Sequence, residues 1–261
     1  MASLSLPLAL YSGVIIFLLG TVFGSFINCL SYRVVKGEDP VRGRSRCVNC
    51  GHELSPSDLV PVFSYVFLRG RCRYCGEKIS PRYLIAEVLM GLLFLFAFIR
   101  FGLSLSTLTV CGAAVILMGL SLTDLESYEI PDGFIIALII WWAVSVLLKA
   151  LTGQAWVRYL TDGIIGGVSV AGGILLLSLI FDRLLGKESL GGGDIKLFFA
   201  AGLFLGVASS LFNLILSCLV GLAFAFLLKK NKIPFGPSIA LSTYLSMLFG
   251  PMVTGWYLSL L

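Results

Sequence analysis

The chain has 261 residues and a net charge of +5, and 58% of its residues are hydrophobic while only 13% are charged. A soluble domain is usually about 45–50% apolar and about 25% charged, so this composition excludes an ordinary cytosolic globular protein. It also excludes a disordered chain and a small disulfide-linked secreted scaffold. With a mean hydropathy of +0.99, the chain is predicted to be an all-α polytopic membrane protein.

The first predicted span covers the apolar residues 8–30. Residues 1–32 contain no charged side chain, and they lack the basic start of a cleaved signal peptide, so we expect a retained helix. Further apolar runs follow at about 83–99, 104–123, 133–148, 163–181, 195–228 and 237–259. The run 195–228 exceeds the roughly 20 residues of one crossing and fits two short helices with a turn near Gly206 to Ser210. About eight transmembrane helices are therefore expected.

The basic residues predict how these helices are oriented. Sixteen of the nineteen Lys and Arg residues fall in the segments 31–82, 124–132, 182–196 and 229–236. Basic segments stay on the cytosolic side of a membrane, so both termini are expected outside. The chain then divides into a first transmembrane helix at 1–32, a cytosolic four-cysteine domain at 33–82 and a seven-helix membrane domain at 83–261.

Two C-x-x-C pairs are expected to organise the loop at 33–82. Cys47 and Cys50 form the first pair, and Cys72 and Cys75 form the second. Four thiolates on two such turns can converge on one tetrahedral Zn²⁺ ion, which lets a small loop fold without a large core. A reducing cytosolic setting argues against disulfides. Redox cysteines and a metal-free loop are the alternatives.

The other residues of this loop have structural interpretations. Gly51 and Gly76 follow the second cysteine of each pair, where a knuckle turn often needs a small residue. His52 is expected to be a surface or supporting residue rather than a fifth ligand. Three further cysteines lie in apolar spans and are expected to be inert packing residues: Cys29, Cys111 and Cys218. The basic residues from Arg33 to Arg82 are expected to face anionic lipid, and no nucleic-acid partner is predicted.

Two carboxylates lie where apolar runs meet the cytosolic side. Asp124 ends the run 104–123, and Asp194 opens the run 195–228. An acid in hydrocarbon costs about 2.5–3.5 kcal/mol at a helix centre, so each is a candidate functional residue. Asp194 could alternatively cap a helix, whereas Asp124 near a helix C-terminus opposes the helix dipole. At equal depth the two acids can share a proton and activate water, as in an aspartic protease.

Taken together, the motifs resemble those of the type IV prepilin peptidases, polytopic aspartyl proteases of the GxGD type. The resemblance covers nearly the whole chain and rests on five motifs in order: G-S-F-I-N-C-L-S-Y-R at 24–33, R-G-R-C-R-Y-C-G at 69–76, I-S-P-R-Y-L-I-A-E at 79–87, D-L-E-S-Y-E-I-P-D at 124–132 and G-G-G-D-I-K at 191–196. It implies a bacterial inner-membrane enzyme that removes the short basic leader of prepilins or pseudopilins at the cytosolic face. It also implies N-methylation of the new N-terminus with S-adenosylmethionine.

The resemblance assigns roles to particular residues. Asp124 and Asp194 match the two catalytic aspartates, and Gly70 falls at a position linked to methyl transfer. Glu126 stands where the family often has a second Asp. The metal-binding cysteines of the family match Cys47, Cys50, Cys72 and Cys75.

The residues beside the two aspartates predict how the substrate is held. Gly191, Gly192 and Gly193 would let a substrate strand approach the backbone closely. Glu126, Glu129 and Asp132 could attract the basic leader by charge. These three acids could instead cap or solvate a turn, since Pro131 marks a helix start.

Two other classes of protein are alternatives to this interpretation. A transporter or channel would use Asp124 and Asp194 as ion sites, but such proteins favour acids near the bilayer midplane. The apolar runs carry no acid at their centres, which argues against transport. The second alternative is an inactive scaffold with a zinc loop.

Overall fold

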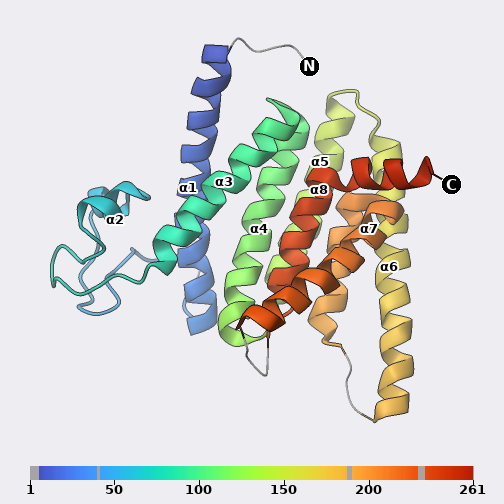
Figure 1. Ribbon diagram of the computed structural model, residues 1–261. Coiled ribbons are helices and arrows are strands. Elements are labelled where there is room, and N and C mark those ends of the chain that lie inside the picture. The colour runs from blue at the N-terminus through green and yellow to red at the C-terminus, as the bar shows by residue number, and fades with distance from the viewer. Residues whose placement is uncertain (1–5, 40–41, 187–189, 229–232, 261) are drawn as a thin grey trace. The chain divides into compact units, whose positions relative to one another are not determined.

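The structure is a computed structural model that describes residues 6–39, 42–186, 190–228 and 233–260 (Figure 1). Its described part is almost entirely helical, with two isolated β-bridges in the loop after the first helix. In chain order the elements are α1 (Leu6–Lys36), the 3₁₀ helix η1 (Pro56–Leu59), α2 (Phe63–Phe67), α3 (Arg82–Phe101), α4 (Leu105–Ser127), α5 (Asp132–Leu151), α6 (Trp156–Leu185), α7 (Gly192–Leu228) and α8 (Gly236–Leu258). The all-α prediction is confirmed.

Six of the described helices are long and apolar enough to cross a membrane: α1, α3, α4, α5, α6 and α7. The chain is therefore a multi-pass membrane protein. Helix α7 is counted once although it bends at Gly206, where φ is 69° and ψ is 179°. This bend confirms the turn predicted near Gly206 to Ser210. The predicted number of about eight treats the two halves of α7 separately and includes α8, which contains Pro251.

The chain divides into two compact units, residues 1–119 and 120–261, and the boundary falls inside α4. In the first unit, glycines let α1 pack closely on α3. A Cβ atom on Gly20 would lie 2.8 Å from the Cα of Gly91, and one on Gly24 would lie 2.8 Å from the carbonyl oxygen of Ala86. Small residues of this kind allow close helix contact where lipid supplies no hydrophobic drive for association. The three-part division predicted at residues 32 and 82 stays a prediction.

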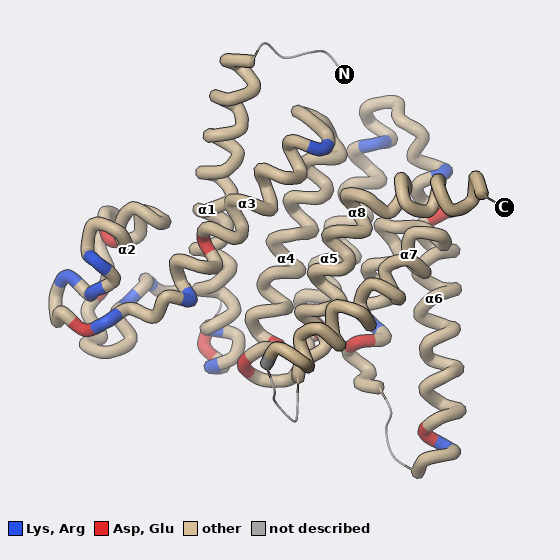
Figure 2. The backbone as a smooth tube through the Cα atoms, viewed as in Figure 1, with Lys and Arg blue, Asp and Glu red and all other residues tan. Residues whose placement is uncertain are grey.

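The polar part of the first unit is the segment that connects α1 to α3 in the sequence. Figure 2 shows Lys, Arg, Asp and Glu gathered in this segment, whereas the long helices carry few charges. This segment, residues 42–81 of the described chain, is called the four-cysteine module below. The module contains η1 and α2. It follows α1 in the chain and precedes α3.

In the second unit, a glycine interface joins α6 to α7. A Cβ atom on Gly166 would lie 2.5 Å from the carbonyl carbon of Gly206, and one on Gly202 would lie 2.6 Å from the Cα of Gly167. A Cβ atom on Gly163 would overlap the carbonyl oxygen of Leu203. Figure 1 shows α7 reversing its direction after this contact. The glycines therefore place the bend of α7 directly against α6.

Candidate active site and metal centre

Asp124 lies in the last turns of α4 and is buried, with 4% of its surface exposed. Its Oδ2 atom accepts a hydrogen bond of 2.9 Å from the backbone N–H of Gly236. Gly236 is the first residue of α8, so the carboxylate faces the positive end of that helix. The side chain is therefore held in one orientation inside the second unit.

Gly236 was not identified by the sequence reasoning. A Cβ atom on this residue would lie 2.5 Å from Oδ2 of Asp124, which is too close for any side chain. The available signal was the run Phe235-Gly236-Pro237 at the start of the last apolar segment, since proline favours the first turn of a helix. That signal predicts a helix start, but it does not name Asp124 as the partner.

Asp194 is the third residue of α7 and is partly exposed. Gly193, the residue before it, packs on Ile130 in the loop that follows α4, so Asp194 lies near the end of α4 that carries Asp124. Among residues 6–39, 42–186, 190–228 and 233–260, no donor is recorded on the Asp194 carboxylate. The structure therefore gives no support to the alternative that Asp194 caps its helix.

The three glycines before Asp194 differ in their surroundings. Gly191 and Gly192 are exposed, and a Cβ atom on Gly192 would meet nothing within 4 Å. A Cβ atom on Gly193 would lie 3.1 Å from the Cβ of Ile130, in the loop between α4 and α5. The backbone at Gly191 and Gly192 is thus open to a ligand, while Gly193 packs against that loop.

The acids between α4 and α5 are all exposed, but they are not equivalent. Asp132, at the start of α5, forms an ion pair of 2.7 Å with Nζ of Lys196. This pair joins the start of α5 to the first turn of α7, two residues after Asp194. Glu126 also has an interaction partner. In the described part of the chain, the carboxylate of Glu129 has none recorded.

The four predicted cysteine ligands come together in the module. Their sulfur atoms all lie within 4.8 Å of one another, and the sulfurs of Cys47 and Cys75 are 4.0 Å apart. Four sulfurs at about 2.3 Å from one tetrahedral Zn²⁺ ion would be about 3.8 Å apart. The cluster can therefore hold a metal ion with little adjustment.

The two halves of the cluster have the same backbone geometry. The N–H of Gly51 donates to the carbonyl of Cys47, and the N–H of Gly76 donates to that of Cys72, both at 2.9 Å. Gly51 and Gly76 have φ values of 71° and 72°, a left-handed conformation that disfavours side chains. The glycine knuckle predicted at both positions is thereby confirmed.

The thiols of Cys47 and Cys50 differ in their pKa. The N–H of Cys50 is the main cause that lowers the pKa of Cys47 to about 7. The N–H of His52 favours the Cys50 thiolate, but desolvation and the neighbouring sulfurs outweigh it and raise the pKa of Cys50 to about 11. Sulfurs this close repel one another as anions, and a bound cation would remove that repulsion.

The histidine and the three cysteines outside the cluster agree largely with their predicted roles. His52 lies outside the ligand cluster and its ring packs on that of Tyr74, with centroids 3.7 Å apart. Cys111 is buried, as expected of a packing residue, and Cys29 is partly exposed. Cys218 differs, because it is exposed on α7 where lipid can surround it.

Gly70 is buried between α2 and the second knuckle. Its φ is +66°, and a Cβ atom there would lie 2.9 Å from the hydroxyl oxygen of Tyr65. Its carbonyl accepts a hydrogen bond of 2.8 Å from the N–H of Ile79. A side chain at this position would displace Tyr65, so the position requires glycine for the fold of the module.

Comparison with known proteins gives one consistent result. Residues 18–101 match the bacterial peptidase A24 N-terminal domain, and residues 110–226 match the type IV leader peptidase family. The prepilin leader peptidase/N-methyltransferase of Bacillus subtilis (strain 168) is 32% identical over 253 residues, which cover 94% of this chain and 98% of that protein. The chain belongs to the type IV leader peptidase family.

Other members of the leader peptidase family match to a similar extent. The protein of the same name from Aeromonas salmonicida is 32% identical over 279 residues, covering 94% of this chain and 93% of its own. The one from Pseudomonas aeruginosa is 28% identical over 271 residues, covering 92% and 91%. No solved structure matches the chain at a significant level.

Membership confirms the resemblance and the enzyme class. The chain is a peptidase of the leader peptidase family with methyltransferase activity. Family membership does not favour the alternative that the protein is a transporter or channel.

Proposed function

We propose that this enzyme removes the short basic leader of type IV prepilins or pseudopilins and then methylates the new N-terminus. The observation that carries the peptidase part is that the start of α7, with Asp194, packs through Gly193 on Ile130, in the loop that follows Asp124 at the end of α4. The relatives named prepilin leader peptidase/N-methyltransferase support the substrate and the second activity. Both acids are needed for the reaction, and no nucleophilic side chain takes part.

The two aspartates would divide the work of peptide hydrolysis. Asp124 accepts the N–H of Gly236, a hydrogen bond that stabilises a carboxylate anion, so we assign it the role of base. It removes a proton from water, which attacks the scissile carbonyl. Asp194 carries the shared proton, stabilises the tetrahedral oxygen by a hydrogen bond and then protonates the leaving amine.

The substrate would reach this site from the lipid. A prepilin spans the membrane through its own apolar helix, and its leader junction would unwind beside the exposed backbone of Gly191 and Gly192. An extended junction can form hydrogen bonds with such an open backbone. Glu129, and Glu126 beside it, would attract the basic leader.

We further propose the orientation that the basic residues favour. The predicted four-cysteine domain at 33–82 faces the cytosol, both termini lie outside, and the enzyme sits in the bacterial inner membrane. The three-part division into 1–32, 33–82 and 83–261 belongs to this proposal. The lipid bilayer and the membrane-inserted prepilin are its partners, and no nucleic acid is involved.

The four cysteines would hold one structural Zn²⁺ ion. Closed Cys₄ sites stabilise small folds and leave no open position for catalysis. The metal would fix the two knuckles and, with them, the loop from η1 to Gly70. Its ligands would be Cys47, Cys50, Cys72 and Cys75.

S-adenosylmethionine would supply the methyl group as an electrophilic sulfonium. The module and the end of α1 offer groups that fit this donor, in a cavity of about 490 Å³ lined by Arg33, Arg42, Glu53 and neighbouring residues. Guanidinium groups match its carboxylate and acids match its ribose hydroxyls. Binding of radiolabelled donor to the enzyme, weakened in Arg42→Ala and unchanged in Arg100→Ala, would support this location; equal binding would exclude it.

The proposed function is tested by incubating a prepilin with the purified native enzyme and with Asp124→Asn and Asp194→Asn variants. Mass spectrometry of the products should show leader loss with the native enzyme and none with either variant. Asp162→Asn, on α6, is the matched control and should cleave normally. With S-adenosylmethionine present, the product should gain the mass of one CH₂ unit, because a methyl group replaces a hydrogen. A native enzyme that leaves the prepilin intact would disprove the peptidase proposal.

A further inference from the structure

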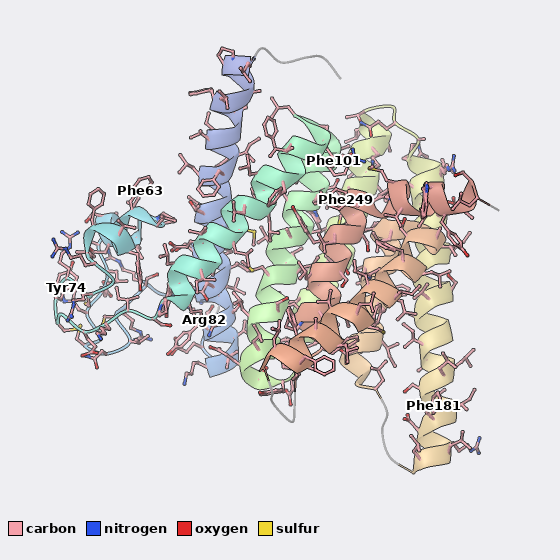
Figure 3. The ribbon with its side chains drawn as sticks, viewed as in Figure 1. Phe63, Tyr74, Arg82, Phe101, Phe181 and Phe249 are labelled. Carbon is pink, nitrogen blue, oxygen red and sulfur yellow. The ribbon has the colours of Figure 1, made fainter. Side chains whose placement is uncertain are left out.

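Helix α2 presents an apolar face in an otherwise polar module. Phe63, Val66 and Phe67 are 51%, 60% and 81% exposed, and Leu59 and Val60 just before them are also exposed. Five exposed apolar residues within nine positions form a patch of the kind that marks an interaction surface. Figure 3 labels Phe63 on α2, and Tyr74 on another side of the module.

The depth of α2 relative to the membrane helices of the first unit follows from one contact. The N–H of Val62, the residue before α2, donates a hydrogen bond of 2.7 Å to Oε2 of Glu87 in α3. Glu87 in turn lies beside Gly24 of α1, whose Cβ atom would be 2.9 Å from the Cα of Glu87. The start of α2 is therefore level with Gly24.

Gly24 lies well inside the apolar part of α1. The first basic residue of that helix is Arg33, nine positions later, which corresponds to about 13 Å along the helix axis. At the same height on α3, Ile85 and Leu89 are exposed and apolar. The start of α2 is thus level with apolar parts of α1 and α3 that meet lipid, on the hydrocarbon side of the headgroups.

The residue that attaches α2 to α3 has a strained backbone. Val62 has φ +64° and ψ −54°, a conformation that is costly for a β-branched residue. The buried carboxylate of Glu87 holds the Val62 N–H in that conformation. A strained backbone held by a buried carboxyl group indicates that the direction of α2 is set by the fold of this unit.

The charges that follow α2 complement an anionic surface. Arg69 comes two residues after the helix, and Arg69 and Lys78 are both exposed. In the part of the chain that the structure describes, neither cation has a recorded acidic partner. Exposed cations beside an aromatic face are typical of segments that lie on anionic inner-leaflet lipid.

We propose that α2 inserts Phe63, Val66 and Phe67 into the inner leaflet, so that the four-cysteine module is docked on the bilayer rather than free in the cytosol. The occupant of the patch is lipid, with Arg69 and Lys78 at the headgroups. Docking holds Gly70, three residues after α2, at the membrane surface. A substrate N-terminus released at that surface would then remain close to the module that we link to methyl transfer.

The test places a photoreactive benzoylphenylalanine at position 67 or 63 of the full-length enzyme. The protein is reconstituted in vesicles of phosphatidylethanolamine and phosphatidylglycerol, irradiated, and its adducts are identified by mass. Position 48 is the matched control, because Val48 is 71% exposed in the same module but lies in the first knuckle. Position 18, on the exposed face of α1, is the positive control for lipid.

Lipid adducts at positions 67 and 63, several-fold above those at position 48, are the expected result. Adducts to a second copy of the enzyme, or to a prepilin added to the vesicles, would overturn the proposal by identifying another occupant. Adducts at position 18 without any at 67 would also overturn it. The readout does not need leader cleavage, so its failure is distinguishable from failure of the proposed function.

Discussion

The backbone N–H of Gly236 donates a 2.9 Å hydrogen bond to Oδ2 of Asp124 across 112 positions of the chain. The Asp124 carboxylate also leaves no room for a Cβ atom on residue 236. Helix α8 therefore begins at the carboxylate that we assign as the catalytic base. The last helix of the chain contributes to the site without contributing a side chain.

Replacing Gly236 by Ala should therefore reduce leader cleavage by about 10²-fold or more, because the methyl group forces the Asp124 carboxylate out of position. The kcat/KM for a prepilin, measured with the purified variant, checks this. Gly255→Ala, in the same helix, is the control, since a Cβ atom there meets nothing within 4 Å. Equal cleavage by the two variants would show that the contact does not position the aspartate.

Reversing the charge of Glu129 should weaken binding of basic leaders. Glu129 is exposed, so the effect acts through long-range attraction and should raise the KM a few-fold while kcat stays near the native value. A prepilin with a neutral leader is the control and should show no change with Glu129→Lys. An unchanged KM for the basic leader would remove Glu129 from the substrate site.

The α6–α7 glycine interface should tolerate no added methyl group. Gly166→Ala would place a Cβ atom 2.5 Å from the backbone of Gly206, and such overpacking typically costs about 1–3 kcal/mol. The Tm in detergent should fall by several degrees. Gly173→Ala on the same helix has open space, and helix propensity predicts an equal or higher Tm there. Matching Tm values would contradict the interface.

Replacing one of the four cysteines should empty the proposed zinc site. Cys72→Ser is expected to reduce bound zinc from one ion per chain to a small fraction, because three thiolates bind the ion far more weakly. Elemental analysis of the purified protein gives the stoichiometry. Cys111→Ser removes a buried cysteine outside the cluster and should retain the ion. A native protein without zinc would contradict the assignment.

The Asp58 carboxylate should make the module sensitive to acid. The Ser55 hydroxyl, at 2.6 Å, is the main cause that holds the pKa of Asp58 below its usual value. A pKa that is lower in the folded state stabilises the fold above the unfolded pKa of about 3.9, and this contribution disappears as the pH falls through the folded value. Asp58→Asn should therefore lower the Tm at pH 7.

The difference in Tm between the native enzyme and Asp58→Asn should shrink as the pH is lowered below about 4, since the native carboxyl is then protonated as well. Glu53→Gln is the control, because Glu53 forms only an exposed pair with Arg44, and such pairs contribute little. A difference in Tm that stayed constant from pH 7 to pH 3 would show that ionised Asp58 does not stabilise the module.

Several features of the site could be predicted because they depend on local sequence. The knuckles at Gly51 and Gly76 follow from the C-x-x-C spacing, and both have the expected left-handed glycine. The bend of α7 at Gly206 follows from an apolar run too long for one crossing. Each of these features is decided by residues a few positions apart, so the chain pattern contains the information.

Other features are contacts between residues far apart in the sequence, and no local sequence pattern predicts them. The ion pair between Asp132 and Lys196 joins two helix starts, and the bond from Val62 to Glu87 sets the depth of α2. Each involves ordinary residue types whose partners are chosen only when helices pack. The sequence predicted that Asp132 could cap or solvate a turn, and the structure adds the lysine that it binds.

The sequence by itself determined the membrane fold, the four candidate metal ligands and the two candidate aspartates, because hydropathy, cysteine spacing and acids at the ends of apolar runs are properties of short segments. Only the tertiary structure decided what surrounds Asp124. The amide of Gly236 can reach that carboxylate only after α8 packs beside the end of α4. The contact uses a backbone N–H and needs a residue without a side chain, so no sequence pattern within either segment predicts it.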